Sequence, residues 1–284
     1  MKKNGSIEAH SVLAEAQGVR ISRIVIYAPE IAAKARAGQF IVLMCSEHGE
    51  RIPLTIVSHD ALKGTITVIF QEAGLTTTFL GRLVAGDVLY ALVGPLGTPT
   101  EIERYGKVIT IGGGVGIAEA YPVAKAYKEA GNRVVVIIGA RTKDLLILVD
   151  GLKAVSDELY ITTDDGSFGR KGFVTDVLKE LIAKDTYDIV YTVGPIPMMK
   201  AVSSATRAVG IKTPVSLNAL MVDATGMCGS CRVTVDGKTK FSCIDGPEFN
   251  GHLVDWEELD KRNRIYAAQE AHVCKLKHIQ GRLT

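Results

Sequence analysis

The chain has 284 residues, 47% hydrophobic and 23% charged, a balance typical of a globular protein rather than a disordered one. A formal net charge of +2 gives no reason to expect a nucleic-acid partner. The first residues, MKKNGSIEAHS, lack the apolar segment of a secretory signal, and no apolar run reaches transmembrane length, so no membrane partner is expected. Five cysteines, three of them clustered, fit a cytoplasmic protein with a metal site better than an extracellular disulfide framework.

Residues 1–103 have the pattern of an antiparallel β-barrel or sandwich. Segments 20–29 (RISRIVIYAP), 39–45 (QFIVLMC) and 64–70 (GTITVIF) are rich in β-branched and apolar residues, as strands are. Glycine and proline separate them at regular spacing, as in GERIP, AGD and GPLG. Such spacing is typical of a barrel.

Residues 104–217 alternate between strands and helices. Buried strands are predicted at KVITIGG and RVVVIIGA, and an amphipathic helix at GIAEAYPVAKAYKEAG between them. The alternation continues through ELYITTDDG, KGFVTDVLKELIAKD, DIVYTVG and PMMKAVSSATRAVG, with TPVSLN as a last strand. This order predicts a parallel, doubly wound, Rossmann-like sheet. Residues 218–284 follow as a third, small domain with a cysteine loop, a hairpin that turns at Asp236-Gly237, and a polar tail.

A glycine-rich turn, IGGGVGIAEA (111–120), connects the first of these strands to its helix. Glycines there let backbone N–H groups approach a pyrophosphate at the helix N-terminus, although the spacing matches G-x-G-x-x-G only loosely and a turn used for packing alone remains an alternative. The turns GAR (139–141) and VGPIPMM (193–199) also follow strands. Because ligands of such sheets bind beyond the carboxyl ends of the strands, the three turns together favour a nucleotide site.

Two polar motifs in the first region suggest a flavin site. A barrel that precedes a nucleotide domain can hold a flavin, and RIPLT (51–55) would then place Arg51 at its pyrophosphate and Thr55 near its isoalloxazine ring. GLTTTFL offers Gly74, Thr76 and Thr77 at an expected helix start, a second anion site. An arginine beside a strand is, however, often only a solvated residue.

The third region contains the pattern D-x4-C-x2-C-x11-C, formed by Asp223, Cys228, Cys231 and Cys243. Plant-type [2Fe–2S] sites have cysteine in the first position, and a carboxylate carries the same charge as a thiolate and can ligate iron. The alternatives are a structural zinc site with His252 or His272 as fourth ligand, or an Asp223 that only caps a turn. The spacing favours iron–sulfur; Cys45 and Cys274 are expected to be ordinary residues, with Cys274 a reserve ligand.

In sequence order, RIPLT, GPLGTP, GGGVGIA, TTDDGSFGRKGFVTD, VGPIPMMK and SLNALMVDATGMCGSCRV resemble the ferredoxin–NADP reductase superfamily over nearly the whole chain. Within it they are similar to the branch with the dihydroorotate dehydrogenase electron-transfer subunit. That subunit has four cysteines, whereas the small subunits of NADH-dependent reduced ferredoxin:NADP oxidoreductases, also known as sulfide dehydrogenase subunits, have an aspartate first. Asp223 therefore favours the second group. Glu119 is a departure, because the resemblance predicts proline there.

The resemblance implies an N-terminal FAD-binding barrel, an NAD(P)-binding Rossmann-like domain and a C-terminal [2Fe–2S] domain. It implies FAD contacts at Arg51, Pro53, Leu54, Thr55, Phe70, Gln71, Gly74, Thr76 and Thr77. It implies NAD(P) contacts at Gly113, Gly114, Val115, Gly116, Ile117, Gly139, Arg141, Asp165, Gly194, Pro195 and Met198. Catalysis would then need no acid–base residue beyond the redox cofactors.

By the same resemblance, the partner is a larger flavoprotein with FAD and further iron–sulfur clusters. That complex splits an electron pair, sending one electron to ferredoxin and the other through the small chain to NAD. NAD(H) is the expected cofactor, although Arg141, Lys143 and Asp144 of the GARTKD turn leave NADP(H) possible on charge alone. Two alternatives stay open: the electron-transfer subunit of an NAD-linked dihydroorotate dehydrogenase, and a zinc-stabilised, nucleotide-binding redox sensor.

Overall fold

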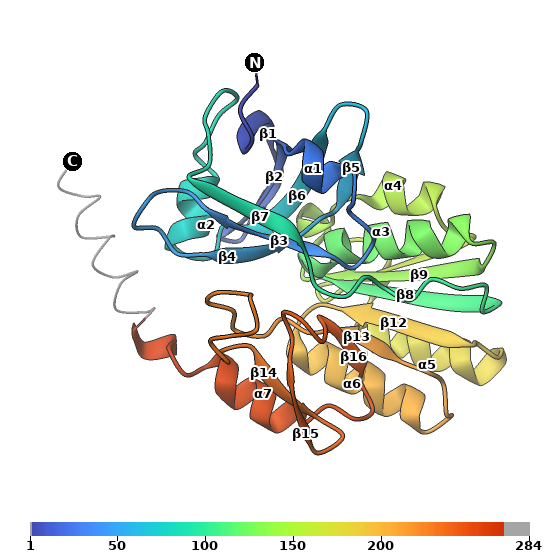
Figure 1. Ribbon diagram of the computed structural model, residues 1–284. Helices are drawn as coiled ribbons and strands as arrows, with labels where there is room; N and C mark the ends of the chain where they lie inside the picture. Colours follow the sequence, from blue (N-terminus) through green and yellow to red (C-terminus); the bar gives the residue numbers. More distant parts are fainter. Residues whose placement is uncertain (1, 270–284) are drawn as a thin grey trace.

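The computed structural model describes residues 2–269. Its N-terminal part has two antiparallel sheets, with strand orders β1-β2-β6-β5 and β4-β3-β7, which confirms the antiparallel fold predicted for this region (Figure 1). Alternating apolar residues of the strands face inward, so that Ile24, Ile26, Ile66 and Val68 are fully buried. The elements are β1 (Ser6–Ala16), β2 (Val19–Tyr27), α1 (Pro29–Ala32), β3 (Phe40–Met44), β4 (Ile52–Thr55), β5 (Ser58–Asp60), β6 (Thr65–Gln71), α2 (Leu75–Leu80) and β7 (Ala91–Leu96).

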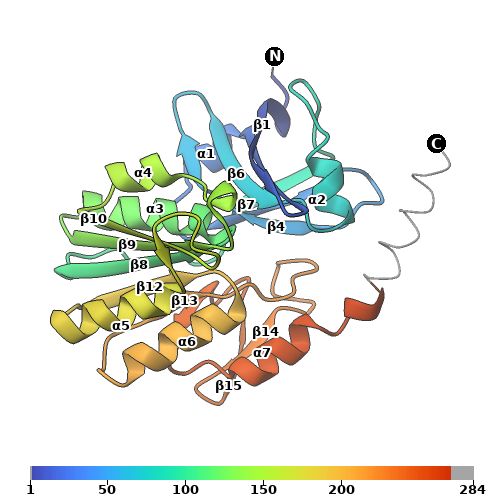
Figure 2. The ribbon, with the colours of Figure 1, turned by 180° about the vertical axis from the view of Figure 1, so that it is seen from behind.

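The middle part is the predicted parallel sheet, with helices on both faces. Its strands lie in the order β11-β10-β9-β8-β12-β13, and β16 (Glu248–Asn250) of the C-terminal part follows at the edge. Helices α3 and α4 lie over one face and α5 and α6 over the other (Figures 1 and 2). The elements are β8 (Lys107–Gly113), α3 (Gly116–Glu129), β9 (Arg133–Ala140), η1 (Lys143–Leu145), α4 (Val149–Ala154), β10 (Glu158–Thr163), β11 (Arg170–Lys171), α5 (Val174–Lys184), β12 (Ile189–Val193), α6 (Ile196–Arg207) and β13 (Pro214–Ser216). Within residues 2–269, no helix has the length and apolar character needed to cross a bilayer.

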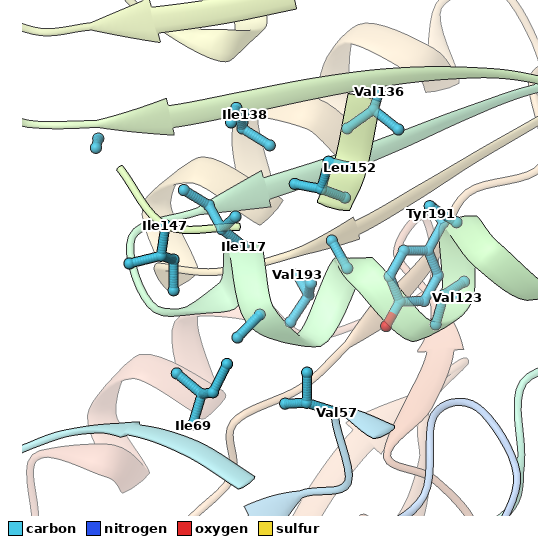
Figure 3. Packing of buried hydrophobic residues seen from close by; sticks show 14 of the residues in the cluster. Val57, Ile69, Ile117, Val123, Val136, Ile138, Ile147, Leu152, Tyr191 and Val193 are labelled. Atoms are coloured by element: carbon cyan, nitrogen blue, oxygen red, sulfur yellow. The ribbon is translucent and has the colours of Figure 1, made fainter. Parts of the chain in front are cut away.

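Helix α3 lies between the barrel and the parallel sheet. Figure 3 shows its residues Ile117 and Val123 among Tyr191 and Val193 of β12 and Ile69 of the barrel. One continuous apolar core therefore joins the barrel to the nucleotide domain, and the glycine turn that starts α3 is held at the boundary between them.

The C-terminal part has more secondary structure than the predicted polar tail. The hairpin of β14 (Arg232–Val235) and β15 (Lys238–Phe241) turns at Asp236 and Gly237, whose φ angles of 54° and 68° fit a two-residue type I′ turn and confirm the prediction. After Cys243 the chain forms β16 (Glu248–Asn250) and α7 (Trp256–Asn263), which begins at the capping side chain of Asp255. Strand β16 pairs antiparallel with β13 and becomes the edge of the middle sheet.

All three parts contribute to a third core. Phe40 and Val42 of the barrel pack there with Met199, Val215 and Leu217 of the middle part, and with Cys231, Cys243 and Trp256 of the C-terminal part. Thr98 reinforces the junction, donating from its backbone N–H to the Gly246 carbonyl at 2.6 Å. Such a shared core fixes the positions of the three parts relative to one another. The domain boundaries at 103/104 and 217/218 stay predictions.

Candidate functional site

A cleft of about 870 Å³ opens between the barrel and the carboxyl edge of the parallel sheet. Its volume is within the range of pockets that take small ligands and cofactors. Its walls come from β4 and β6 of the barrel and from the loops that follow β8, β9, β10 and β12. The cleft therefore lies where a doubly wound sheet is expected to bind its ligand.

The barrel wall of the cleft contains most of the residues predicted to contact FAD. Those that line the cleft are Pro53, Leu54, Thr55, Phe70, Gln71 and Thr77. Arg51, Gly74 and Thr76 do not line it: Arg51 is exposed, and the buried hydroxyl of Thr76 donates to the Glu50 carboxylate at 2.5 Å. Thr77, which lines the cleft, also accepts a hydrogen bond from the backbone N–H of Gly74 at 2.9 Å and so fixes the start of α2.

The opposite wall is formed by the glycine turns. At Gly114, φ is +58° and a Cβ atom would meet nothing within 4 Å, so this residue presents bare backbone to open space. At Gly116, by contrast, a Cβ atom would lie 2.7 Å from the Val193 carbonyl oxygen, so this glycine allows α3 to pack closely against β12. The turn therefore has both roles that the sequence suggests: Gly114 leaves room for a ligand, and Gly116 allows close packing.

Most of the residues predicted to contact NAD(P) line this wall. They are Gly113, Gly114, Val115, Gly116, Gly139, Arg141, Gly194, Pro195 and Met198. Two others lie elsewhere: Ile117 is fully buried in the core, and Asp165 is exposed and accepts from the Ser167 hydroxyl at 2.7 Å. The structure adds Asp164, Phe173, Ser216 and Asn218 to the wall. These residues come from loops and strand ends that only the sheet topology brings together.

Two carboxylates line the cleft within residues 2–269, Glu119 and Asp164. Asp164 and the third titratable lining residue, Arg141, are exposed, whereas Glu119 is half-buried in the first turn of α3. Burial raises the pKa of the Glu119 carboxyl, and the nearby Thr55 hydroxyl partly offsets that rise. The residue that departs from the predicted pattern therefore lies beside the barrel wall of the cleft.

The cysteine loop brings two of the predicted cluster ligands into contact. Cys231 and Cys243 are buried, with their Sγ atoms 3.2 Å apart, whereas Cys228 is exposed. The Asp223 carboxylate accepts from the Thr225 hydroxyl at 2.6 Å. Positive φ angles at Gly226 and Gly229, +82° and +69°, let the loop turn tightly between Asp223 and Cys231.

The thiols of this loop differ in acidity. Hydrogen bonds from the backbone and hydroxyl of Ser230 lower the pKa of Cys228. Burial, together with the neighbouring Cys231, raises the pKa of Cys243 to about 12. A metal bound at Cys243 would displace its proton, as metals do at coordinating thiols.

The zinc alternative needs a histidine beside the cysteines of the loop. A structural zinc ion needs four ligands around one point, and within residues 2–269 no three His, Cys, Asp or Glu side chains converge in that way. His252 is engaged elsewhere, with its Nε2 3.0 Å from the Thr206 hydroxyl on α6. His272 and Cys274 lie outside the described residues. The four ligands predicted for a [2Fe–2S] cluster are likewise not gathered around one point in the described residues.

An ion pair connects the cysteine loop to the barrel. The Arg51 guanidinium Nη1 lies 3.8 Å from Oδ1 of Asp223. The arginine predicted to contact the flavin thus faces the aspartate predicted to ligate iron. Met221, two residues before Asp223, lines the cleft, so the candidate flavin and cluster sites are neighbours in space although their motifs are far apart in the sequence.

Two family models match the chain. Residues 110–204 match an oxidoreductase NAD-binding domain, and residues 218–255 match the iron–sulfur cluster binding domain of dihydroorotate dehydrogenase B. The first match covers the glycine turns and the second covers the whole D-x4-C-x2-C-x11-C pattern.

Related proteins match most of the chain. A Thermotoga maritima protein named dihydroorotate dehydrogenase B (NAD(+)), electron transfer subunit homolog, is 51% identical, with 86% of each chain covered. A probable subunit of the same name from Methanopyrus kandleri is 36% identical, over 78% of this chain and 81% of that one. A solved structure described as that of NADH-dependent reduced ferredoxin-NADP oxidoreductase, in work on flavin-based electron bifurcation, superposes with a TM-score of 0.89 at 47% identity, covering 95% of this chain and 96% of the other.

Proposed function

Because the chain belongs to the family of dihydroorotate dehydrogenase B electron-transfer subunits, we propose that it is the small subunit of an electron-bifurcating, NADH-dependent ferredoxin:NADP oxidoreductase. More generally, it is an NAD(P)H-dependent electron-transfer subunit of a flavin and iron–sulfur oxidoreductase. Its cofactors are FAD, an iron–sulfur cluster and NAD(H). Such a subunit works with a larger catalytic subunit.

The residues described above fit these cofactors. When bound, nicotinamide supplies electrons as hydride, the flavin exchanges both pairs and single electrons, and the cluster carries single electrons. The barrel wall around Thr55 would hold the isoalloxazine ring, and the bare backbone of Gly114 would approach the pyrophosphate of the dinucleotide. Asp223, Cys228, Cys231 and Cys243 would hold the cluster beside Arg51.

The observation that favours a bifurcating oxidoreductase is the presence of Asp223 at the first position of the cluster pattern. The resemblance described above has aspartate there in the bifurcating oxidoreductases and cysteine in the dihydroorotate subunits. The 47% identity to a structure described in terms of electron bifurcation supports the same choice. The expected partner is a larger flavoprotein with FAD and further iron–sulfur clusters, and the complex would exchange electrons with ferredoxin.

A second candidate is the electron-transfer subunit of an NAD-linked dihydroorotate dehydrogenase. The 51% identity to the Thermotoga maritima protein of that name supports it. The two candidates differ in the larger subunit and in the substrate that this subunit oxidises or reduces. The chemistry expected of the cleft and the cysteine loop is the same in both.

The test compares the chain alone with the chain bound to its larger subunit. Alone, it should reduce an artificial dye with NADH but should not reduce NADP from reduced ferredoxin, because the splitting of the electron pair belongs to the larger subunit. Complete bifurcation by the isolated chain would contradict this division of labour. Copurification with a subunit that oxidises dihydroorotate would establish the second candidate.

A further inference from the structure

Three polar residues lie on one face of the parallel sheet: Tyr191 and Ser216 are buried, and Glu248 is half-buried. Ser216 of β13 pairs with Val193 of β12 on one side and with Glu248 of β16 on the other. Paired residues of neighbouring strands point to the same face, and so does Tyr191, two residues before Val193. This is the face covered by α3, where Figure 3 shows the Tyr191 ring beside Val123.

These three side chains lie close together. The Tyr191 hydroxyl lies near the Ser216 hydroxyl and the Glu248 carboxyl, and the Thr100 hydroxyl donates a hydrogen bond to Glu248. Tyr191 is 1% exposed and Ser216 is 9% exposed. A row of groups that can donate and accept protons therefore lies in an otherwise apolar core.

The row has a cavity at each end. Ser216 lines the main cleft, in which Glu119 also lies, and Glu119 is close enough to Tyr191 to influence it electrostatically. Glu248 lines a second cavity of about 240 Å³, on whose rim lie the exposed Glu101 and Lys212.

The second cavity is suited to water. Its lining includes Tyr127, whose side chain is fully buried and whose hydroxyl has no hydrogen-bond partner in the described part of the chain. A cavity of this volume has room for several water molecules, and polar groups such as the Tyr127 hydroxyl and the Glu248 carboxyl could bind them.

The proposed redox reaction needs such a connection. Oxidation of one NADH by two one-electron acceptors gives NAD⁺, two reduced acceptors and one proton. A bound dinucleotide would fill the mouth of the cleft and exclude bulk water from the place where that proton is released. A second route for the proton would remove this restriction.

We propose that Ser216, Tyr191 and Glu248 form a proton path that leads from the cleft, beside Glu119, to the second cavity. The path rests on the proposed function, since it serves the proton of NADH oxidation. The proton moves along the hydroxyls of Ser216 and Tyr191 to the carboxylate of Glu248, and from there to water in the second cavity. No electron moves along this path.

The surroundings of Glu248 fit the role of a proton carrier. Burial raises its pKa to about 7, so that this carboxyl can both take up and release a proton near neutral pH. The titratable groups that face it are Tyr191 from β12 and Tyr127 from α3. Both are neutral at that pH, because the ordinary pKa of tyrosine is about 10 and burial raises it further. At the rim of the second cavity, the charges of Glu101 and Lys212 are paired at 2.6 Å.

The test measures proton release and electron transfer in the same rapid-mixing experiment. The flavin- and cluster-loaded chain is mixed with NADH and ferricyanide, and a pH-indicator dye reports the proton while ferricyanide absorbance reports the electrons. Glu248→Gln keeps a hydrogen-bonding side chain but cannot carry the proton, and Tyr191→Phe removes the relay hydroxyl. Each should delay proton release relative to ferricyanide reduction by at least about tenfold.

The matched control is Tyr160→Phe, the same substitution on β10, where the hydroxyl donates to Glu158 at 2.7 Å outside the path. It should release protons at the parent rate. Proton release that keeps pace with electron transfer in both path variants would overturn the path while leaving the proposed function intact. If Glu248→Gln does not fold, Tyr191→Phe decides alone. A parent chain that oxidises no NADH would overturn both proposals.

Discussion

At the scale of single residues, Asp223 is the predicted first ligand of the cluster. A ligating carboxylate must be deprotonated and bound to iron, so Asp223→Ala should leave that iron with three protein ligands and an open position. We expect loss of the cluster or an altered electron paramagnetic resonance signal. Asp223→Cys should restore four-ligand binding with an all-thiolate spectrum and a shifted reduction potential, because sulfur replaces oxygen. Iron analysis and the resonance spectrum of each variant measure these outcomes.

The cysteines supply the comparison for that experiment. Cys228→Ala and Cys231→Ala should be at least as damaging as Asp223→Ala, since both lie on the C-x2-C turn. Cys45→Ala is the matched control, because this free cysteine is on the barrel, away from the loop. Cys274→Ala should likewise keep the cluster. If Asp223→Ala keeps its full iron content while Cys274→Ala loses iron, the fourth ligand is Cys274 and not Asp223. The choice of a bifurcating oxidoreductase would then lose its basis.

Glu248 makes stability depend on pH in a defined direction. Its pKa rises from about 4.5 in the unfolded chain to about 7 in the folded protein, so folding binds a proton in that window. The protonated form stabilises the fold fully below pH 4.5, and this contribution is lost as pH rises through 7. The free energy of unfolding, measured with urea at pH 5 and pH 8, should therefore change less between the two pH values in Glu248→Gln than in the parent chain. The difference should be at most about 3 kcal/mol. An unchanged pH dependence would contradict the position of this carboxyl.

At the scale of elements, the turn between β8 and α3 separates packing from ligand approach. Gly116→Ala places a Cβ atom 2.7 Å from the Val193 carbonyl and should lower the free energy of unfolding by about 1–3 kcal/mol. Gly114→Ala meets no protein atom within 4 Å but obstructs the cleft and strains a φ of +58°. It should weaken NADH binding by about tenfold, a loss near 1.4 kcal/mol. Denaturation and NADH titration of both variants test the contrast, which fails if Gly114→Ala binds NADH normally.

The sequence predicts those elements whose signal is local. The strand at 133–140 is a continuous apolar run, the hairpin has Asp236-Gly237 at its turn, and the glycine turn at 112–116 marks the start of α3. Strand β16 is only three residues long and exists because it pairs with β13. Helix α7 is short and mostly polar, so its pattern resembles a tail, although Trp256 and Leu259 are buried.

The same distinction between local sequence signals and contacts made only by the fold applies to the residues of the candidate site. Motif residues such as Thr55, Gly114 and Cys231 could be found because their chemistry needs a particular local spacing. Ser216, Tyr191 and Glu248 have no motif and meet only through the register of three strands. The neighbourhood of Arg51 and Asp223 likewise depends on how the barrel packs against the cysteine loop.

At the scale of the whole molecule, three parts share one core and place two candidate redox sites side by side. Residues from all three parts pack around Cys231 and Cys243, so the cluster loop is supported by the barrel and by the nucleotide sheet. The Arg51–Asp223 pair joins the barrel to the cysteine loop at 3.8 Å, and Met221 of that loop lines the cleft. This arrangement suits a chain whose task is to hold cofactors close together while they exchange electrons.

The most direct test of this account is an anaerobic titration of the purified chain with NADH, followed by visible absorption and electron paramagnetic resonance. We predict bleaching of a bound flavin and, on the same chain, the appearance of the signal of a reduced [2Fe–2S] cluster. Asp223→Ala should retain the flavin change and lose or alter the resonance signal. A colourless protein with one zinc ion, or a flavin that is reduced while an intact cluster stays oxidised, would contradict electron transfer through this chain.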